Sequence, residues 1–129
     1  MAYPANYKYT KEHEWIAVEG NIGSIGITDY AQDSLGDIVF VELPKVGDAL
    51  EAGKTFGSIE SVKSVSDLFS PVTGTVTAIN EHLTIAPETI NAEANTTWIL
   101  KLELDDPTQV AALLSATDYE AFISEETGH

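Results

Sequence analysis

Alternating apolar and polar positions dominate the beginning of the chain. Residues 7–18 and 22–27 carry apolar side chains at mostly alternate positions, and the polar sequence Glu19-Gly20-Asn21 separates them. Alternation with a period of two places one face of a strand in a core, and a turn rich in Gly and Asn favours a tight reversal of the chain. The pattern predicts an N-terminal β-hairpin.

A helical pattern follows this hairpin. Thr28 or Asp29 is a suitable N-cap residue, Ala31 and Leu35 fall on one helix face, and Gly36 suits the position that follows a helix C-terminus. We therefore expect a short helix of about two turns in this stretch.

The centre of the chain is divided into segments of strand length. Residues 38–41 form a continuous run of β-branched and aromatic side chains, which predicts a strand buried on both faces. Glycine and proline interrupt residues 44–76 repeatedly, as is typical of a small β-sandwich or barrel. Residues 54–60 and 70–76 resemble each other loosely, which predicts two strands that flank a hairpin tip at Lys63.

The last part of the chain carries one more strand and then becomes helical. Residues 98–104 alternate in their second half and predict a strand. Asp106-Pro107 with Gln109 predicts a capped helix start, and the pair Thr117 and Glu120 predicts a second, terminal helix.

The whole pattern predicts one mainly β domain with short helices, which spans residues 1–129. No polar linker divides the sequence, and 129 residues are enough to bury a core without disulfides or metals. The fold class is therefore a small sandwich or barrel with an N-terminal hairpin and a C-terminal helix.

Composition and charge narrow the possible functions. The chain has six basic residues, all Lys, against 21 acidic residues, no Cys, and a formal net charge of −15. Nucleic acids and anionic membranes attract clustered basic groups, so both are disfavoured as partners, whereas a protein with a basic surface is favoured. Without cysteine, the chain has no thiol of its own for redox chemistry or zinc binding.

The sequence shows no targeting or membrane-spanning segment. No apolar run is long enough to cross a bilayer, and residues 1–6 lack the basic and apolar regions of a secretion signal. We expect a cytoplasmic location in a bacterium, or the mitochondrial matrix if the chain is a processed form.

Local motifs for metal or nucleotide chemistry fail on their spacing. Gly53-Lys54-Thr55 lacks the glycine spacing of a phosphate-binding loop, and His13-Glu14 is not followed by the second His of a zinc protease. The three His residues form no local ligand cluster, so we predict no metal site and can assign no catalytic triad.

Lys63 is the unusual lysine. Its neighbours Ser61, Val62, Ser64 and Val65 are small or β-branched, so an amine on a tight turn would stay accessible to a modifying enzyme. By local chemistry alone, a lysine that merely solvates a hairpin tip is the more common case, because exposed charges are usually plain surface. Local residues therefore leave both alternatives open.

Four sequence signatures, in order along the chain, change these odds. Residues 56–67 (FGSIESVKSVSD) resemble the lipoylation segment of glycine cleavage H proteins. Residues 9–15, 26–32 and 35–44 resemble further signatures of that family at the family's spacing. The resemblance runs from about residue 7 to residue 122, which makes coincidence negligible.

The resemblance implies a fold and a function. The implied fold is the barrel-sandwich hybrid of lipoyl and biotinyl carriers, and the implied cofactor is lipoate, attached by an amide to Lys63 on an exposed hairpin. The chain would be a carrier and not an enzyme. Its lipoyl arm would take the aminomethyl group of glycine from the pyridoxal-phosphate-dependent glycine decarboxylase (P protein) to the tetrahydrofolate-dependent aminomethyltransferase (T protein). Dihydrolipoamide dehydrogenase (L protein) would reoxidise the arm, and a lipoate ligase or lipoyltransferase would attach it.

The resemblance also implies roles for five other residues. Glu14 and Asp67 match acidic positions that hold the cationic amine of the loaded arm in a cleft. Ser34 occupies a position of that cleft where some members have His. Glu60 and Gly74 match positions linked to recognition by the lipoylating enzyme.

The match is poorer in residues 85–97, and other carriers remain alternatives. Ala94 stands where the family usually has Pro, and Thr97 precedes Trp98 where Gly is usual. A lipoyl domain of a 2-oxoacid dehydrogenase often has Asp before its lysine, where Val62 stands here, and a biotin carrier usually flanks its lysine with Met. A lipoyl relay protein and an unmodified interaction module are further alternatives.

Overall fold

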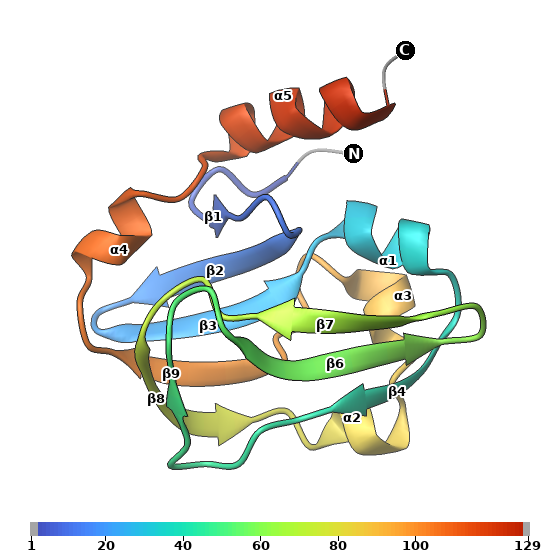
Figure 1. The fold of residues 1–129 in the computed structure, drawn as a ribbon, viewed down its shortest axis with the longest axis horizontal. Coiled ribbons are helices and arrows are strands. Elements are labelled where there is room, and N and C mark those ends of the chain that lie inside the picture. The colour runs from blue at the N-terminus through green and yellow to red at the C-terminus, as the bar shows by residue number, and fades with distance from the viewer. Residues whose placement is uncertain (1–2, 128–129) are drawn as a thin grey trace.

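Two antiparallel sheets, packed against each other, form the body of the molecule (Figure 1). The computed structural model describes residues 3–127. The six-stranded sheet has the order β1 (Lys8–Tyr9), β2 (Glu14–Glu19), β3 (Ile22–Ile27), β9 (Leu100–Leu104), β8 (Gly74–Ile79) and β5 (Ala49–Leu50). The three-stranded sheet has the order β4 (Ile38–Glu42), β6 (Thr55–Ser61) and β7 (Val65–Phe69).

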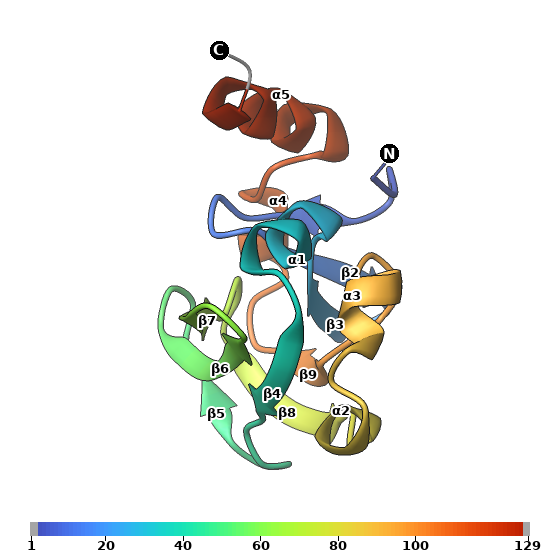
Figure 2. The same cartoon turned by 90° about the vertical axis from the view of Figure 1, so that its right-hand side faces the viewer.

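Five short helices surround these sheets. They are α1 (Asp29–Leu35), α2 (His82–Ile85), α3 (Thr89–Glu93), α4 (Thr108–Ala111) and α5 (Ala116–Thr127). Figure 2 shows α5 at one end of the molecule, where Tyr119 packs against Tyr9 of β1 in a buried aromatic cluster. The predicted class, mainly β with short helices and a helical C-terminus, is therefore correct.

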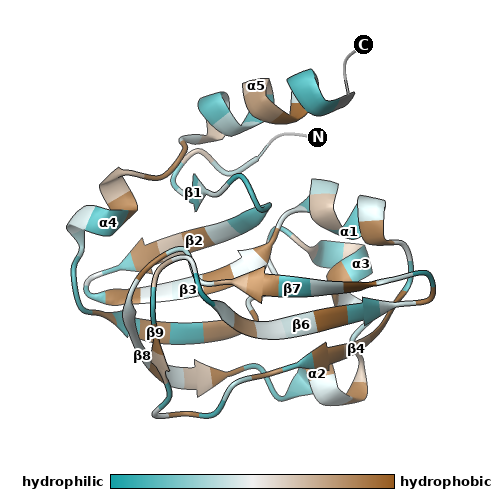
Figure 3. Cartoon of the chain, in the orientation of Figure 1, coloured by the Kyte–Doolittle hydropathy of each residue, from teal (hydrophilic) through white to brown (hydrophobic). Residues whose placement is uncertain are grey.

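The hydrophobic core lies between the sheets. Ile59 and Leu68 of the three-stranded sheet pack with Ile27, Ile99 and other buried apolar side chains. A second buried cluster is made mostly by side chains of the six-stranded sheet, among them Ile25, Val76 and Leu102. Figure 3 shows hydrophobic segments in the strands of both sheets. Burial of apolar surface drives this arrangement, and the period-two pattern decides which face of each strand takes part.

The N-terminal hairpin and the first helix are confirmed. Strands β2 and β3 pair from Glu14 to Glu19, and Gly20 takes a positive φ of 64° in the two-residue turn between them. Thr28, rather than Asp29, caps α1, because its hydroxyl accepts a hydrogen bond from Ala31 N at 3.2 Å. Gly36 ends the helix with a φ of 80°.

Strand β4 is not buried on both faces, so that prediction was wrong. Val39 and Phe40 are 50% and 53% exposed, whereas Ile38 and Val41 are buried. The strand lies at an edge of the three-stranded sheet, and an irregularity between Ile38 and Phe40 turns two consecutive side chains outward. A continuous apolar run can mark a bulged edge strand as well as a central one.

The two similar stretches of sequence do not form one hairpin, which also corrects the prediction. The first is β6, whose hairpin partner is β7, whereas residues 70–76 lead into β8 of the other sheet. The glycine in each stretch is required by packing. A Cβ at Gly57 would run into the carbonyl oxygen of Glu42, and a Cβ at Gly74 would run into that of Glu103.

The helical tail is present, but its caps differ from the prediction. The Asp106 carboxylate does accept a hydrogen bond from Thr108 N, at 3.0 Å, whereas Gln109 turns away from the cap. Gln109 instead accepts a hydrogen bond from Thr73 N at 2.7 Å. Helix α5 is capped by Ser115, because its hydroxyl accepts a hydrogen bond from Asp118 N at 3.1 Å.

Residues 80–97, which have no regular sequence pattern, contain the short helices α2 and α3. Each is anchored by one buried apolar side chain, Leu83 in α2 and Ile90 in α3. Helices of four or five residues offer too few positions for a period of 3.6 to be recognised.

Candidate functional site

Lys63 lies at the exposed tip of the hairpin that β6 and β7 form (Figure 1). Ser61 ends β6 and Val65 begins β7, and Ser61 N donates a hydrogen bond to Ser64 O at 2.8 Å across the turn. The side chains of residues 62–64 are all exposed. The predicted position of Lys63 on a tight, accessible turn is therefore what the structure shows.

The hydroxyl of Ser61 organises this turn. It accepts hydrogen bonds from Lys63 N at 3.3 Å and from Ser64 N at 3.1 Å, and it lies 3.3 Å from Ser64 O, to which it can donate. A serine side chain that bonds to the next backbone amides is a recurrent way to hold a tight turn. Sequence reasoning treated Ser61 only as a small neighbour and missed this role.

The tip rests on the segment that joins α1 to β4. Val62 N donates to Asp37 O at 2.9 Å, and Ile38 pairs with Ser61. The Lys63 side chain lies over Gly36, since a Cβ there would be 3.4 Å from Lys63 Cε. That distance is an ordinary van der Waals contact, so glycine is favoured at this position by its φ of 80°, and the lysine stem and amine both lie close to it.

Glu14 is almost completely buried, with 1% of its surface exposed. Thr10 Oγ1 donates a hydrogen bond of 2.6 Å to one carboxylate oxygen, and Phe69 N donates one of 3.1 Å to the other. Burial raises the pKa of Glu14 to about 7, and the two hydrogen bonds only partly oppose it. Near neutral pH, this carboxyl group is therefore present in both protonation states.

The other two predicted residues of the arm cleft lie on β7 and on α1. Asp67 is exposed in the middle of β7. Glu14 accepts a hydrogen bond from Phe69, the last residue of that strand. At about 3.3 Å per residue, Phe69 lies about 13 Å along the strand from Val65, its first residue. Ser34 is exposed on α1, two residues before Gly36. The structure thus places Asp67 along the hairpin and Glu14 at its base, whereas Ser34 lies on α1, near the end of the helix that precedes Gly36.

The two residues predicted for ligase recognition are far apart in the fold. Glu60 is exposed on β6, next to the hairpin tip. Gly74 is buried in β8, in the other sheet, where a Cβ would meet the Glu103 backbone and the Leu102 side chain. Its lack of a side chain is thus explained by packing within the six-stranded sheet.

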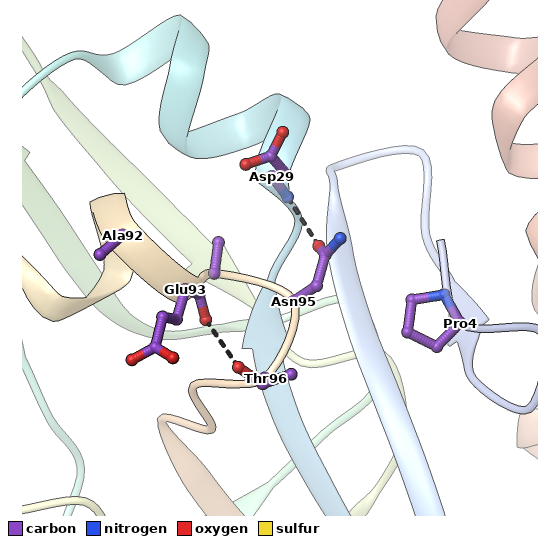
Figure 4. Close-up of a pocket in the computed structure, with 7 residues that line it drawn as sticks. Pro4, Asp29, Ala92, Glu93, Asn95 and Thr96 are labelled. Atoms are coloured by element: carbon purple, nitrogen blue, oxygen red, sulfur yellow. Dashed lines mark hydrogen bonds between the residues drawn. The ribbon is translucent and has the colours of Figure 1, made fainter. Parts of the chain in front are cut away.

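An open cavity of about 330 Å³ lies elsewhere, below the start of α1 (Figure 4). It is lined by Pro4, Asp29, Ala92, Glu93, Ala94, Asn95 and Thr96. Asn95 accepts a hydrogen bond from Asp29 N at 2.9 Å, which ties the start of α1 to the residues after α3. Neither Lys63 nor the predicted arm residues line this cavity.

Within residues 3–127, no three His, Cys, Asp or Glu side chains gather in a group that could hold a metal ion. In the same part of the chain, no helix is long and apolar enough to cross a membrane.

Comparison with known sequences decides the family. The family model described as "Glycine cleavage H-protein" matches residues 7–126. The chain belongs to the glycine cleavage H-protein family. The family's members are lipoyl carriers of the glycine cleavage system, so this chain is a carrier that works with the glycine cleavage enzymes.

Individual H proteins match over their whole length. The glycine cleavage system H proteins of Acidobacterium capsulatum and Koribacter versatilis are 67% and 61% identical over 129 residues, which is 100% of both chains in each case. The H protein of Staphylococcus epidermidis is 50% identical over 126 residues, with 97% of this chain and 100% of the relative covered.

A solved H-protein structure confirms the fold. The crystal structure of a glycine cleavage system H protein from Mycobacterium marinum superposes with a TM-score of 0.84 at 34% identity. It covers 98% of this chain and 99% of that one. The two-sheet architecture and the helical C-terminus are thus those of an H protein.

Proposed function

We propose that Lys63 is the attachment site of the lipoyl arm and that this chain acts as a carrier, not as a catalyst. The observation that supports the proposal is the seat of the lysine. Its stem lies over Gly36 at the exposed tip, the turn is held by the Ser61 hydroxyl, and its neighbours leave the amine accessible. A lysine held in this way presents its Nζ to a modifying enzyme in a defined place.

A path for the loaded arm runs back along the hairpin. The amine of an aminomethyl group is cationic near neutral pH, and Asp67 and then Glu14 lie along β7 from the tip towards its base. Glu14 is covered, so the amine reaches it only if the residues that cover it move aside; its carboxylate oxygens each keep a free lone pair beside the hydrogen bonds from Thr10 and Phe69. A neighbouring cation would also favour the ionised form of Glu14.

The proposed partners are those that this cycle requires. Glycine decarboxylase loads the arm, aminomethyltransferase unloads it, dihydrolipoamide dehydrogenase reoxidises it, and a lipoate ligase or lipoyltransferase attaches it. Glu60, exposed beside the tip, is placed to contact the lipoylating enzyme, whereas buried Gly74 can affect that enzyme only through packing. The named relatives are bacterial, which supports a cytoplasmic location.

Intact mass after incubation with a lipoate ligase, lipoate and ATP tests the attachment site. We expect the wild-type chain to gain one lipoyl group. Lys63→Arg should gain none, because arginine keeps the charge but is no acceptor for the acyl group. Lys54→Arg is the matched control, since Lys54 is also exposed at a turn next to β6, and it should gain the group at the wild-type rate. Lipoylation of folded Lys63→Arg would reject the assignment.

Glu14→Gln tests the proposed path of the arm. The neutral amide cannot pair with the amine as a carboxylate does, so the aminomethylated arm should hydrolyse faster, while lipoylation itself stays unchanged. The lifetime of the loaded arm, followed by intact mass after loading with glycine and glycine decarboxylase, measures this effect. An unchanged lifetime would remove Glu14 from the path and leave the Lys63 assignment intact.

A further inference from the structure

The carboxamide of Asn91, on α3, joins three elements of the fold. Its Oδ1 accepts a hydrogen bond from Ile38 N at 2.9 Å. Its Nδ2 donates to Gly36 O at 2.9 Å and to Gln32 Oε1 at 3.0 Å. An amide offers two donor hydrogens and one carbonyl acceptor, so each polar atom of this side chain is used.

The backbone fixes the orientation of this amide. Ile38 N is a donor and requires the amide oxygen, whereas Gly36 O is an acceptor and requires the amide nitrogen. A carboxylate of the same shape at position 91 would satisfy Ile38 N but would set an oxygen against Gly36 O. The site therefore selects an amide over an acid of equal size.

The clamped segment is the seat of the lysine. Gly36 and Asp37 join α1 to β4, which begins at Ile38, and the tip of the β6–β7 hairpin docks on this segment through the hydrogen bond from Val62 N to Asp37 O. The Lys63 stem lies over Gly36, whose carbonyl is one of the two backbone groups that Asn91 holds. The Asn91 side chain thus hydrogen-bonds to both ends of the segment 36–38, on which the hairpin tip docks.

We propose that Asn91 is a positioning residue for the lipoyl arm, because it fixes the segment on which Lys63 rests. This inference rests on the proposed attachment of lipoate at Lys63. A carrier delivers its arm into the sites of several enzymes, so the root of the arm has to stand in one place relative to the docked surface. An error of about 1 Å in the placement of a reacting group costs up to about a hundredfold in rate.

Two variants and one matched control test the proposal. Asn91→Ala removes all three hydrogen bonds, and Asn91→Asp keeps the size of the side chain but loses both donors. Asn80→Ala is the control, because Asn80 Nδ2 also donates a hydrogen bond to a backbone carbonyl, Trp98 O at 2.8 Å, and Asn80 is not one of the residues that hydrogen-bond to residues 36–38. The lipoyl attachment kinetics with a lipoate ligase, lipoate and ATP are measured for each, together with amide hydrogen exchange of Val62 by NMR and the melting temperature.

We expect both Asn91 variants to lower kcat for lipoylation by about tenfold or more, with KM within about twofold of wild type, because the docking surface is kept and the lysine is misplaced. The Val62 amide should exchange at least about tenfold faster, since its bond to Asp37 O is no longer held rigid. Asn80→Ala, which loses one side-chain hydrogen bond, should lower the melting temperature but change neither kcat nor the Val62 exchange rate. If Asn91 only stabilised the fold, its variants would lower the melting temperature and leave kcat and Val62 exchange unchanged.

Wild-type kcat and wild-type Val62 exchange in folded Asn91→Asp would overturn the proposal. If Asn91→Ala does not fold, Asn91→Asp decides, because its packing volume is conserved. The exchange measurement does not depend on lipoate. Failure of the wild-type chain to be lipoylated would therefore reject the proposed function, while slow Val62 exchange in the variants would separately reject the clamp.

Discussion

Glu14 shows at the scale of one residue how burial sets a charge state. The side chain is 1% exposed, and its hydrogen bonds from Thr10 and Phe69 do not make up for the loss of water, so burial raises its pKa from 4.5 to about 7. Because the folded pKa lies above the unfolded one, folding favours the protonated form. This group's contribution to stability is present below pH 4.5 and is lost as the pH rises through about 7.

Glu14→Gln should remove this pH dependence. From pH 5 to pH 8, the wild type should lose roughly 2–3 kcal/mol of unfolding free energy relative to Glu14→Gln. This is the change expected from one group whose pKa is raised from 4.5 to about 7. Urea unfolding of both proteins at the two pH values measures it. A constant difference would mean that Glu14 ionises in the folded chain as it does in the unfolded one.

Single residues of the site divide into those a sequence can indicate and those it cannot. The resemblance of the segment around Lys63 to a family predicted this lysine as the attachment site, although local chemistry alone favoured an unmodified surface lysine. Glu14 accepts a hydrogen bond from Phe69, 55 positions away, and the hydrogen bond from Asn91 to Gly36 also spans 55 positions. Such pairs follow from the tertiary fold, which no spacing along the chain encodes.

At the scale of elements, α5 is attached to the body by a chain of polar contacts inside an aromatic cluster. The Tyr119 hydroxyl lies 2.7 Å from Thr28 Oγ1 and 2.9 Å from His13 Nδ1, and the Tyr119 ring stacks on Tyr9 with a centroid distance of 4.9 Å. Thr28 caps α1, so the C-terminal helix is linked to the helix that ends below Lys63. Burial raises the pKa of Tyr119, which keeps its hydroxyl protonated.

Tyr119→Phe should destabilise the fold by about 1–2 kcal/mol, since it leaves buried partners without their hydrogen bond. Tyr7→Phe is the matched control, because Tyr7 also stacks in this cluster, on Trp15, but no hydrogen bond of its hydroxyl is found among the described residues. Its free energy of unfolding should change by less than about 0.5 kcal/mol. Equal losses for the two variants, measured by urea unfolding, would show that the hydroxyl of Tyr119 contributes nothing specific.

Elements with a regular period could be predicted, and those defined by their neighbours could not. The alternation in β2 and β3 and the caps of α1 were sufficient, because local pattern and tertiary fold agree there. The apolar run of β4 gave no sign that Val39 and Phe40 point outward, which follows from its place at a sheet edge. The start of α5 was misplaced because Ser115 and Thr117 are both good caps by residue type, and only the structure shows that Ser115 accepts the hydrogen bond from Asp118 N.

For the whole molecule, charge and exposed apolar surface combine around the hairpin tip. Phe40, Glu60 and Val65 form one row across the three-stranded sheet, and all three are exposed. With a formal net charge of −15, two copies of the chain repel each other, whereas a partner with a basic surface is attracted over a distance set by the ionic strength. The charge should therefore act mainly on the encounter with partner enzymes and not on the chemistry of the arm.

Loading of the lipoylated carrier by glycine decarboxylase should accordingly depend on salt. Between about 0.1 M and about 1 M potassium chloride, the Debye length falls from about 10 Å to about 3 Å, so the KM for the carrier should rise severalfold while kcat stays nearly constant. Free lipoamide, which is neutral, is the control substrate, and its rate should not follow the same trend. Since steering acts only on a charged carrier, a parallel change with both substrates would place the salt effect on the enzyme and contradict electrostatic steering by this chain.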